Sequence, residues 1–87
     1  MISRTHESFW ACFDALPSHV LRTATEKFRL WRTNPFHPSL HFKPVAGDLW
    51  SVRVTQDYRA LVKRYGDLVV WFWVGTHAEY DRLVRQG

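Results

Sequence analysis

The chain has 87 residues, of which 46% are hydrophobic and 16% aromatic, so a disordered chain is excluded and one modest hydrophobic core is expected. Twelve Lys and Arg against eight Asp and Glu give a net charge of +4, which favours a polyanionic partner such as nucleic acid or an acidic polypeptide without requiring one. The lone Cys12 excludes an internal disulfide and a thiolate metal cluster, and the longest apolar run, residues 68–74, is too short to span a bilayer as a helix. With no stretch typical of a signal peptide at the start, we expect a single cytoplasmic domain over residues 1–87.

The first half of the chain has a helical period. Residues 4–16 are predicted to form a first helix, since Phe9, Phe13 and Leu16 recur at steps of four and three. Pro17-Ser18 break this pattern, and a second helix is expected up to Asn34-Pro35, with an apolar stripe of Val20, Ala24, Phe28 and Trp31. The very short connection predicts an αα-hairpin.

The second half changes to the period of two that is typical of strands. Strands are predicted over residues 40–45, 49–55, 58–64 and 68–74, separated by turns at Gly47-Asp48, Gln56-Asp57 and Gly66. The last of them is apolar on both faces, which is typical of a central strand. Helices followed by such a meander predict an α+β fold, with an N-terminal α-hairpin packed on a small antiparallel β-meander sheet and a short C-terminal helix.

The segment after the apolar strand carries a histidine and a tyrosine at helical spacing. Thr76-His77-Ala78-Glu79 matches a capping box, which predicts a short helix over residues 77–85. His77 and Tyr80 then share one face at a helix N-terminus, where phosphate is attracted. An isolated pair of this kind is more often a solvated histidine beside a packed tyrosine.

Basic residues on the neighbouring strands make a site more specific than that pair alone. Arg53 and Arg59 come from adjacent strands, and guanidinium groups suit phosphate because they donate two parallel hydrogen bonds. Each arginine by itself would be read as a surface cation. We expect Lys63, further along the strand of Arg59, to contact phosphate or RNA as well. His41 and Lys43 are expected to form the rim of this phosphate-binding site.

No metal or other cofactor is expected. Three histidines, His37, His41 and His77, are the available ligands, but Pro38 breaks the helical spacing of the first two and no acidic cluster lies beside them.

The order of elements and the motifs "GDLWSVRV", "DYRALV" and "LVVWFWVGTHAEYDRL" together resemble the RelE/ParE superfamily of toxins from bacterial type II toxin–antitoxin systems. The resemblance covers nearly the whole chain. It implies a toxin that is neutralised by a separate antitoxin, expected to be acidic and partly disordered, and that contacts DNA only through that antitoxin. Many members of the superfamily cleave mRNA on the ribosome without a metal, by attack of the 2′-OH on the neighbouring phosphate.

For this chain the resemblance implies an endoribonuclease with Arg59, His77 and Tyr80 as catalytic residues. The RNA- or phosphate-binding residues are then Arg53, His41, Lys43 and Lys63. The expected partners are the ribosome and mRNA, and no binding to a membrane is expected. Pro44 stands near the place where some nucleases of the superfamily carry a glutamate base, so the general base is left open. Two alternatives share the fold: a ParE-like poison of DNA gyrase without nuclease residues, and an inactive basic binding domain.

Overall fold

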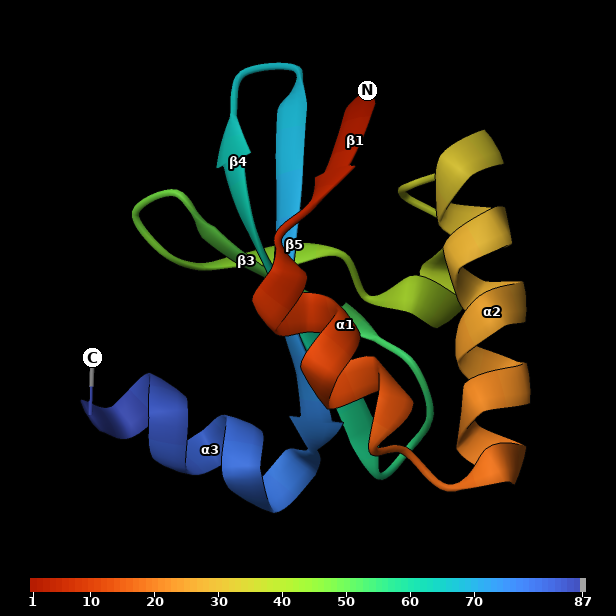
Figure 1. Cartoon of the computed structure of the whole chain (residues 1–87). Helices are drawn as coiled ribbons and strands as arrows, with labels where there is room; N and C mark the ends of the chain where they lie inside the picture. The colour runs from red at the N-terminus through yellow and green to blue at the C-terminus, as the bar shows by residue number, and fades with distance from the viewer. Residues whose placement is uncertain (87) are drawn as a thin grey trace.

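The structure is a computed structural model and describes residues 1–86. These residues form a five-stranded sheet, three α-helices and one 3-10 turn (Figure 1). In chain order the elements are β1 (Ile2–Thr5), α1 (Glu7–Asp14), α2 (Ser18–Thr33), the 3-10 turn η1 (Pro38–Leu40), β2 (Lys43–Ala46), β3 (Leu49–Arg53), β4 (Tyr58–Tyr65), β5 (Leu68–Thr76) and α3 (His77–Gln86).

The sheet has the strand order β1-β5-β4-β3-β2. Strands β2 to β5 form the predicted antiparallel meander, and β1 joins β5 in parallel, with Ile2 opposite Leu68. The predicted α+β class and the C-terminal helix are therefore confirmed, in a mixed sheet. Strand β5 is internal, as its apolar faces require, but it lies between β1 and β4, so the middle strand is β4 and not β5.

The predicted start of the first helix at residue 4 is wrong. Residues 2–5 pair with the outer edge of β5, where the Trp71 Nε1–H also donates to Ser3 Oγ at 2.9 Å. Helix α1 begins only at Glu7, after His6, whose ring accepts the backbone N–H of Ser8. The pairing joins residues more than sixty positions apart, and the exposed side chain of Ile2 gives no alternation that would reveal a strand.

The first strand of the meander starts later than predicted. Leu40 belongs to the turn η1, and His41 follows in the left-handed region at φ +45°. A residue in this conformation cannot continue a pleated strand, so β2 begins at Lys43 instead of Leu40.

Helices α1 and α2 cover one face of the sheet (Figure 1). Aromatic rings fill the space between these helices and the sheet. Phe9 and Trp31 are each 1% exposed, and the rings of Phe28 and Trp71 meet at 4.9 Å between centroids. Replacing such a fully buried ring with alanine costs about 3–5 kcal/mol, so this cluster holds the helices on the sheet. Within the described residues no helix is long and apolar enough to cross a bilayer.

Successive side chains of β3 and β4 point to opposite faces of the sheet. Val52 and Ala60 are fully buried in the aromatic cluster, so their neighbours Arg53 and Arg59 project to the opposite side. We call that side, which faces away from α1 and α2, the open face of the sheet. Figure 1 shows α3 leaving the end of β5 and projecting away from the two other helices.

Candidate functional site

The two arginines of the open face are direct cross-strand neighbours. Arg53 of β3 lies opposite Arg59 of β4, and Arg59 lies opposite Gly75 of β5. Both arginine side chains are half-buried. Like charges directly opposite one another destabilise a sheet, so this pair has a physical cost that a bound anion would remove.

The guanidinium of Arg59 is the most unusual group on this face. Its Nε and Nη1 atoms are buried, and neither has a hydrogen-bond acceptor within residues 1–86. Buried donors without an acceptor are rare in proteins, and they are rarer still on a cation. Arg59 therefore has both the charge and the free donors to bind an oxyanion.

Helix α3 brings an aromatic and an imidazole ring to the same place. The capping box is present as predicted: the Thr76 N–H donates to Glu79 Oε1 at 3.1 Å, and the Glu79 N–H donates to Thr76 Oγ1 at 3.2 Å. These hydrogen bonds lower the pKa of Glu79. The helix start is fixed further by the His77 N–H, which donates to the Asp57 carbonyl at 2.7 Å.

Arg59, Tyr80 and His77 are consequently brought together. The guanidinium carbon of Arg59 lies 5.5 Å from the centre of the Tyr80 ring, within the range of a cation–π contact. The rings of Tyr80 and His77 lie 5.8 Å apart between centroids. One strand and one helix thus supply the three residues that the sequence predicted as catalytic.

A second histidine lies on the other side of the arginine pair. His41 Nε2 is 3.2 Å from Arg53 Nη1, and because a guanidinium only donates, Nε2 must be the unprotonated acceptor nitrogen. Partial desolvation of the ring lowers the pKa of His41 below the ordinary 6.5, and so, in decreasing order, do the positive charges of Arg53, Arg59, Lys43 and Lys27. His41 is therefore neutral near pH 7.

The two lysines predicted as phosphate contacts are placed differently. Lys43 of β2 is one of the cations that act on His41, and it lies opposite Ser51, two residues before Arg53. Lys63 lies four residues beyond Arg59 on β4, about 13 Å along the strand, and lines a separate cavity beside His6 and Ser8. We call the group of Arg53, Arg59, His41, His77 and Tyr80 the arginine cluster. Lys63 is not part of it.

Sequence reasoning missed one residue beside this cluster, Asp81. Its Oδ2 lies 3.1 Å from Nδ1 of His77, one helical turn away. Because a carboxylate only accepts, Nδ1 carries the proton and Nε2 is left as the free ring nitrogen. The spacing of four residues on a predicted helix is the signal that points to Asp81.

Within residues 1–86 the structure brings no three side chains of His, Cys, Asp or Glu together in a group able to hold a metal ion. The geometry of the arginine cluster suits binding of an anion between Arg53 and Arg59, with His41 beside Arg53 and with Tyr80 and His77 on the side of Arg59.

Comparison with known proteins identifies the family. The family model described as the ParE-like toxin domain matches residues 18–82, which is most of the chain. The chain belongs to this family. The match places it in the RelE/ParE superfamily and confirms the resemblance of the sequence motifs. No curated protein matches by sequence.

Solved structures show the same fold at low sequence identity. The RelB–RelE antitoxin–toxin complex from Methanococcus jannaschii contains a chain that is 16% identical to this ParE-like domain, with a TM-score of 0.74 and coverage of 91% of this chain and 96% of that one. YafQ from E. coli is 14% identical, with a TM-score of 0.73 and coverage of 90% and 94%. The RelBE2 toxin–antitoxin complex from Mycobacterium tuberculosis contains a chain 21% identical, with a TM-score of 0.68 and coverage of 87% and 96%.

Proposed function

We propose that this ParE-like domain is the toxin of a type II toxin–antitoxin system and that it is a ribosome-dependent, metal-independent mRNA endoribonuclease. The observation that carries the proposal is the Arg59 guanidinium, whose two buried nitrogens lack an acceptor while Arg53 lies opposite. A phosphodiester fits this place because its oxygens accept the parallel N–H groups of guanidinium and neutralise the paired charge.

The reaction needs one proton removed and one delivered. The 2′-oxygen attacks the adjacent phosphorus, the bond from phosphorus to O5′ breaks, and the products are a cyclic phosphate and a 5′-OH. Arg53 and Arg59 stabilise the charge that develops on the phosphate oxygens. Neutral His41 accepts the proton of the 2′-OH once the phosphate has drawn Arg53 away from its Nε2.

His77 is the proposed proton donor to O5′. With Nδ1–H held by Asp81, protonated His77 presents Nε2–H to the leaving oxygen. Tyr80 lies between His77 and Arg59 and keeps the guanidinium in place, and its exposed side offers a surface on which a base can stack. Lys43 adds positive charge at the rim on the side of His41.

The proposed partner is an antitoxin with an acidic, partly disordered segment. Similar folds occur in structures described as antitoxin–toxin complexes, and the net charge of +4 favours an acidic segment that folds on contact. We propose that this interaction takes place in the cytoplasm, that salt weakens it and that the toxin meets DNA only through the antitoxin.

The test is an in vitro translation reaction with the purified chain, at the magnesium concentration that ribosomes need and with no other divalent metal added. We expect mRNA cuts that end in a cyclic phosphate, that require ribosomes and that do not become faster when Mn²⁺ or Zn²⁺ is added. Intact mRNA together with inhibited DNA gyrase would overturn the nuclease proposal in favour of a gyrase poison. Intact mRNA with fully active gyrase would leave only a binding domain.

A further inference from the structure

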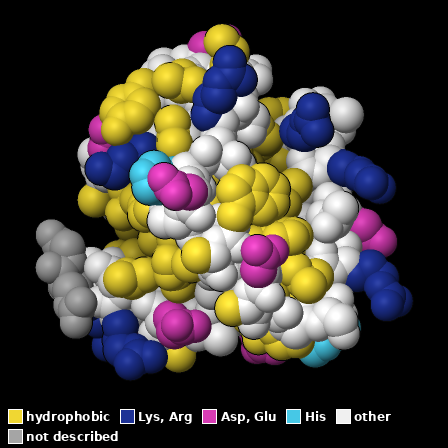
Figure 2. Space-filling model, in the orientation of Figure 1, with side chains coloured by type: hydrophobic (Ala, Val, Ile, Leu, Met, Phe, Trp, Pro, Cys, Tyr) yellow, Lys and Arg dark blue, Asp and Glu magenta, His cyan; other side chains and the backbone are white. Residues whose placement is uncertain are grey.

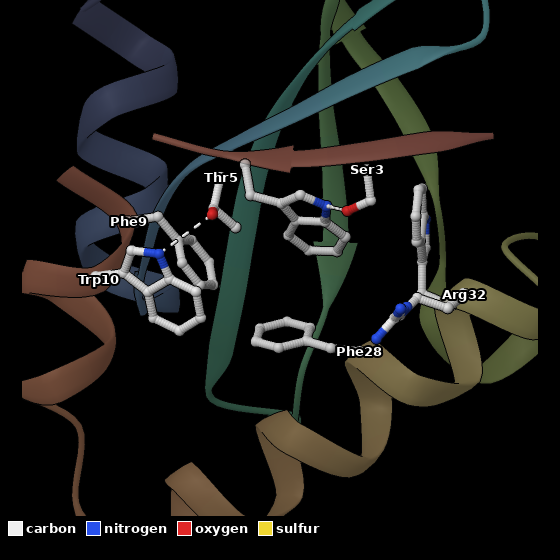
Figure 3. Close-up of a pocket in the computed structure, with 8 residues that line it drawn as sticks. Ser3, Thr5, Phe9, Trp10, Phe28 and Arg32 are labelled. Carbon is white, nitrogen blue, oxygen red and sulfur yellow. Dashed lines mark hydrogen bonds between the residues drawn. The ribbon is translucent and has the colours of Figure 1, made fainter. Parts of the chain in front are cut away.

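A cavity lies on the other side of the sheet, under the two N-terminal helices. Its volume is about 320 Å³, and it is bordered by β1, α1, α2 and β5 (Figure 3). The lining residues are Ser3, Thr5, Phe9, Trp10, Phe28, Trp31, Arg32 and Trp71. This is the side covered by helices, so the cavity is separate from the arginine cluster of the open face.

Aromatic rings form most of the cavity wall. Phe28 and Trp71 meet at 4.9 Å and 62°, and Trp31 and Trp71 at 5.1 Å and 84°. Trp10 is 48% exposed and closes one side, with its ring at 82° to that of Phe9. A flat, apolar molecule is the shape that such a wall accepts, and the cavity volume is within the range of small-molecule sites.

Two hydroxyl groups at this wall have hydrogens without an acceptor. Ser3 Oγ and Thr5 Oγ1 each accept an indole N–H, from Trp71 at 2.9 Å and from Trp10 at 3.1 Å, and within residues 1–86 neither hydroxyl donates a hydrogen bond of its own. The wall therefore offers two hydroxyl hydrogens to a ligand that carries an acceptor.

Arg32 supplies a positive charge at the mouth. Arg32 lines the cavity, and Figure 3 shows its guanidinium next to the Phe28 side chain. Arg32 has no ion-pair partner in the part of the chain that the structure describes. In the view of Figure 2 hydrophobic side chains cover much of the surface, acidic side chains lie near the centre and most Lys and Arg lie towards the edges.

We propose that this cavity is a binding site for a small aromatic monocarboxylate. The ring lies against the edge-to-face pair of Phe28 and Trp71, and the carboxylate accepts hydrogen bonds from Arg32 and from the hydroxyl of Ser3. A cationic aromatic is disfavoured by the charge of Arg32, and a dianionic phosphate by the absence of a second lining cation. The site is independent of the proposed nuclease function.

The experiment follows the five tryptophan indole N–H signals of the whole chain by ¹H–¹⁵N NMR during titration with 2-naphthoate. We expect the Trp10, Trp31 and Trp71 signals to shift with a common dissociation constant on the order of 0.1–1 mM, the range for a ligand of this size. Trp50 and Trp73, which do not line the cavity, should stay in place. Uncharged 2-naphthamide should bind about 10-fold more weakly, since a charge-assisted hydrogen bond is lost.

Two matched variants test the role of the charge. Arg32→Gln should weaken 2-naphthoate binding about 10-fold or more, whereas Arg29→Gln, on the same helix but outside the cavity lining, should not change it. The proposal is overturned if no indole signal moves, if Trp50 or Trp73 moves in place of the cavity residues, or if both variants weaken binding equally. Equal affinity for naphthoate and naphthamide would also overturn it.

Discussion

Replacing Arg59 with methionine should separate the function of the site from its stability. Methionine keeps an unbranched stem but removes the guanidinium, and with it the charge and both unpartnered donors. If Arg59 stabilises a developing phosphorane, Arg59→Met should slow mRNA cleavage on the ribosome by about 10²–10³-fold, the usual loss for one such donor.

The same change should make the folded chain more stable. A buried donor without an acceptor costs about 1–3 kcal/mol, and the repulsion from Arg53 on the next strand adds to that cost. Loss of the contact with the Tyr80 ring takes back about 0.5–1 kcal/mol. A net gain of about 1 kcal/mol raises the melting temperature by roughly 4–8 °C in a domain of this size.

The assay pairs single-turnover cleavage on programmed ribosomes with thermal unfolding followed by circular dichroism. Arg22→Met, on the exposed side of α2, is the matched control and should change neither the rate nor the melting temperature. Cleavage at the parental rate would refute the role of Arg59 in phosphate binding. A melting temperature lower by several degrees would show that Arg59 stabilises the free chain instead of destabilising it.

Three further predictions concern the residues around the arginine pair. His77→Ala should lower the cleavage rate by about 10²–10⁴-fold. Asp81→Asn should lower the rate less, and it should shift the His77 ring from the Nδ1–H towards the Nε2–H form in ¹⁵N NMR spectra. An unchanged tautomer would contradict the role of Asp81. In a plot of cleavage rate against pH, the rise on the acid side should lie below pH 6.5, because His41 must be neutral to act as the base and its pKa is lowered. Arg53→Gln should move this rise to higher pH, because the variant removes a positive charge that lowers the pKa of His41. A rise that does not move would exclude His41 as the base. Tyr80→Phe should keep a rate close to the parental one, because the contact with the guanidinium involves the ring, whereas Tyr80→Ala should lose about 10-fold; a slow phenylalanine variant would show a chemical role for the hydroxyl.

The elements that could be predicted are those whose signal is local. Residues two apart belong to the core cluster, Val52 and Val54 at the end of β3 and Ala60 and Val62 on β4. The capping box places the start of α3 at His77 from four consecutive residues. Because strand period and helix capping are properties of neighbouring residues, one sequence is enough to find them. The placement of Arg53 and Arg59 on one face follows from the same period.

What could not be predicted depends on contacts between distant segments. β1 forms because the outer edge of β5 offers hydrogen-bonding groups, and the sequence of residues 2–5 contains no pattern that predicts this pairing. The left-handed backbone of His41 is set by the turn η1 and directs the ring to Arg53, whereas a regular strand from residue 40 would have continued the alternation. Lys63 shares a strand with Arg59, but four residues of extended strand span about 13 Å, so a shared strand does not bring the two cations together.

The geometry of the arginine cluster depends on an irregularity in the sheet. Along β4 and β5, Leu61 lies opposite Trp73 while Val62 lies opposite Trp71, so Phe72 is an extra residue on β5. Without that bulge, the end of β5 would be shifted by one residue, and Gly75 would no longer lie opposite Arg59. Gly75 is itself constrained, since a Cβ there would come within 2.5 Å of the Trp73 ring. The bulge and the glycine together let β5 run close past Arg59 and deliver His77 and Tyr80 beside it. Strands β3 and β4 bury Val52 and Ala60 on one side and hold the arginine pair on the other, so that the register that builds the core also builds the candidate site.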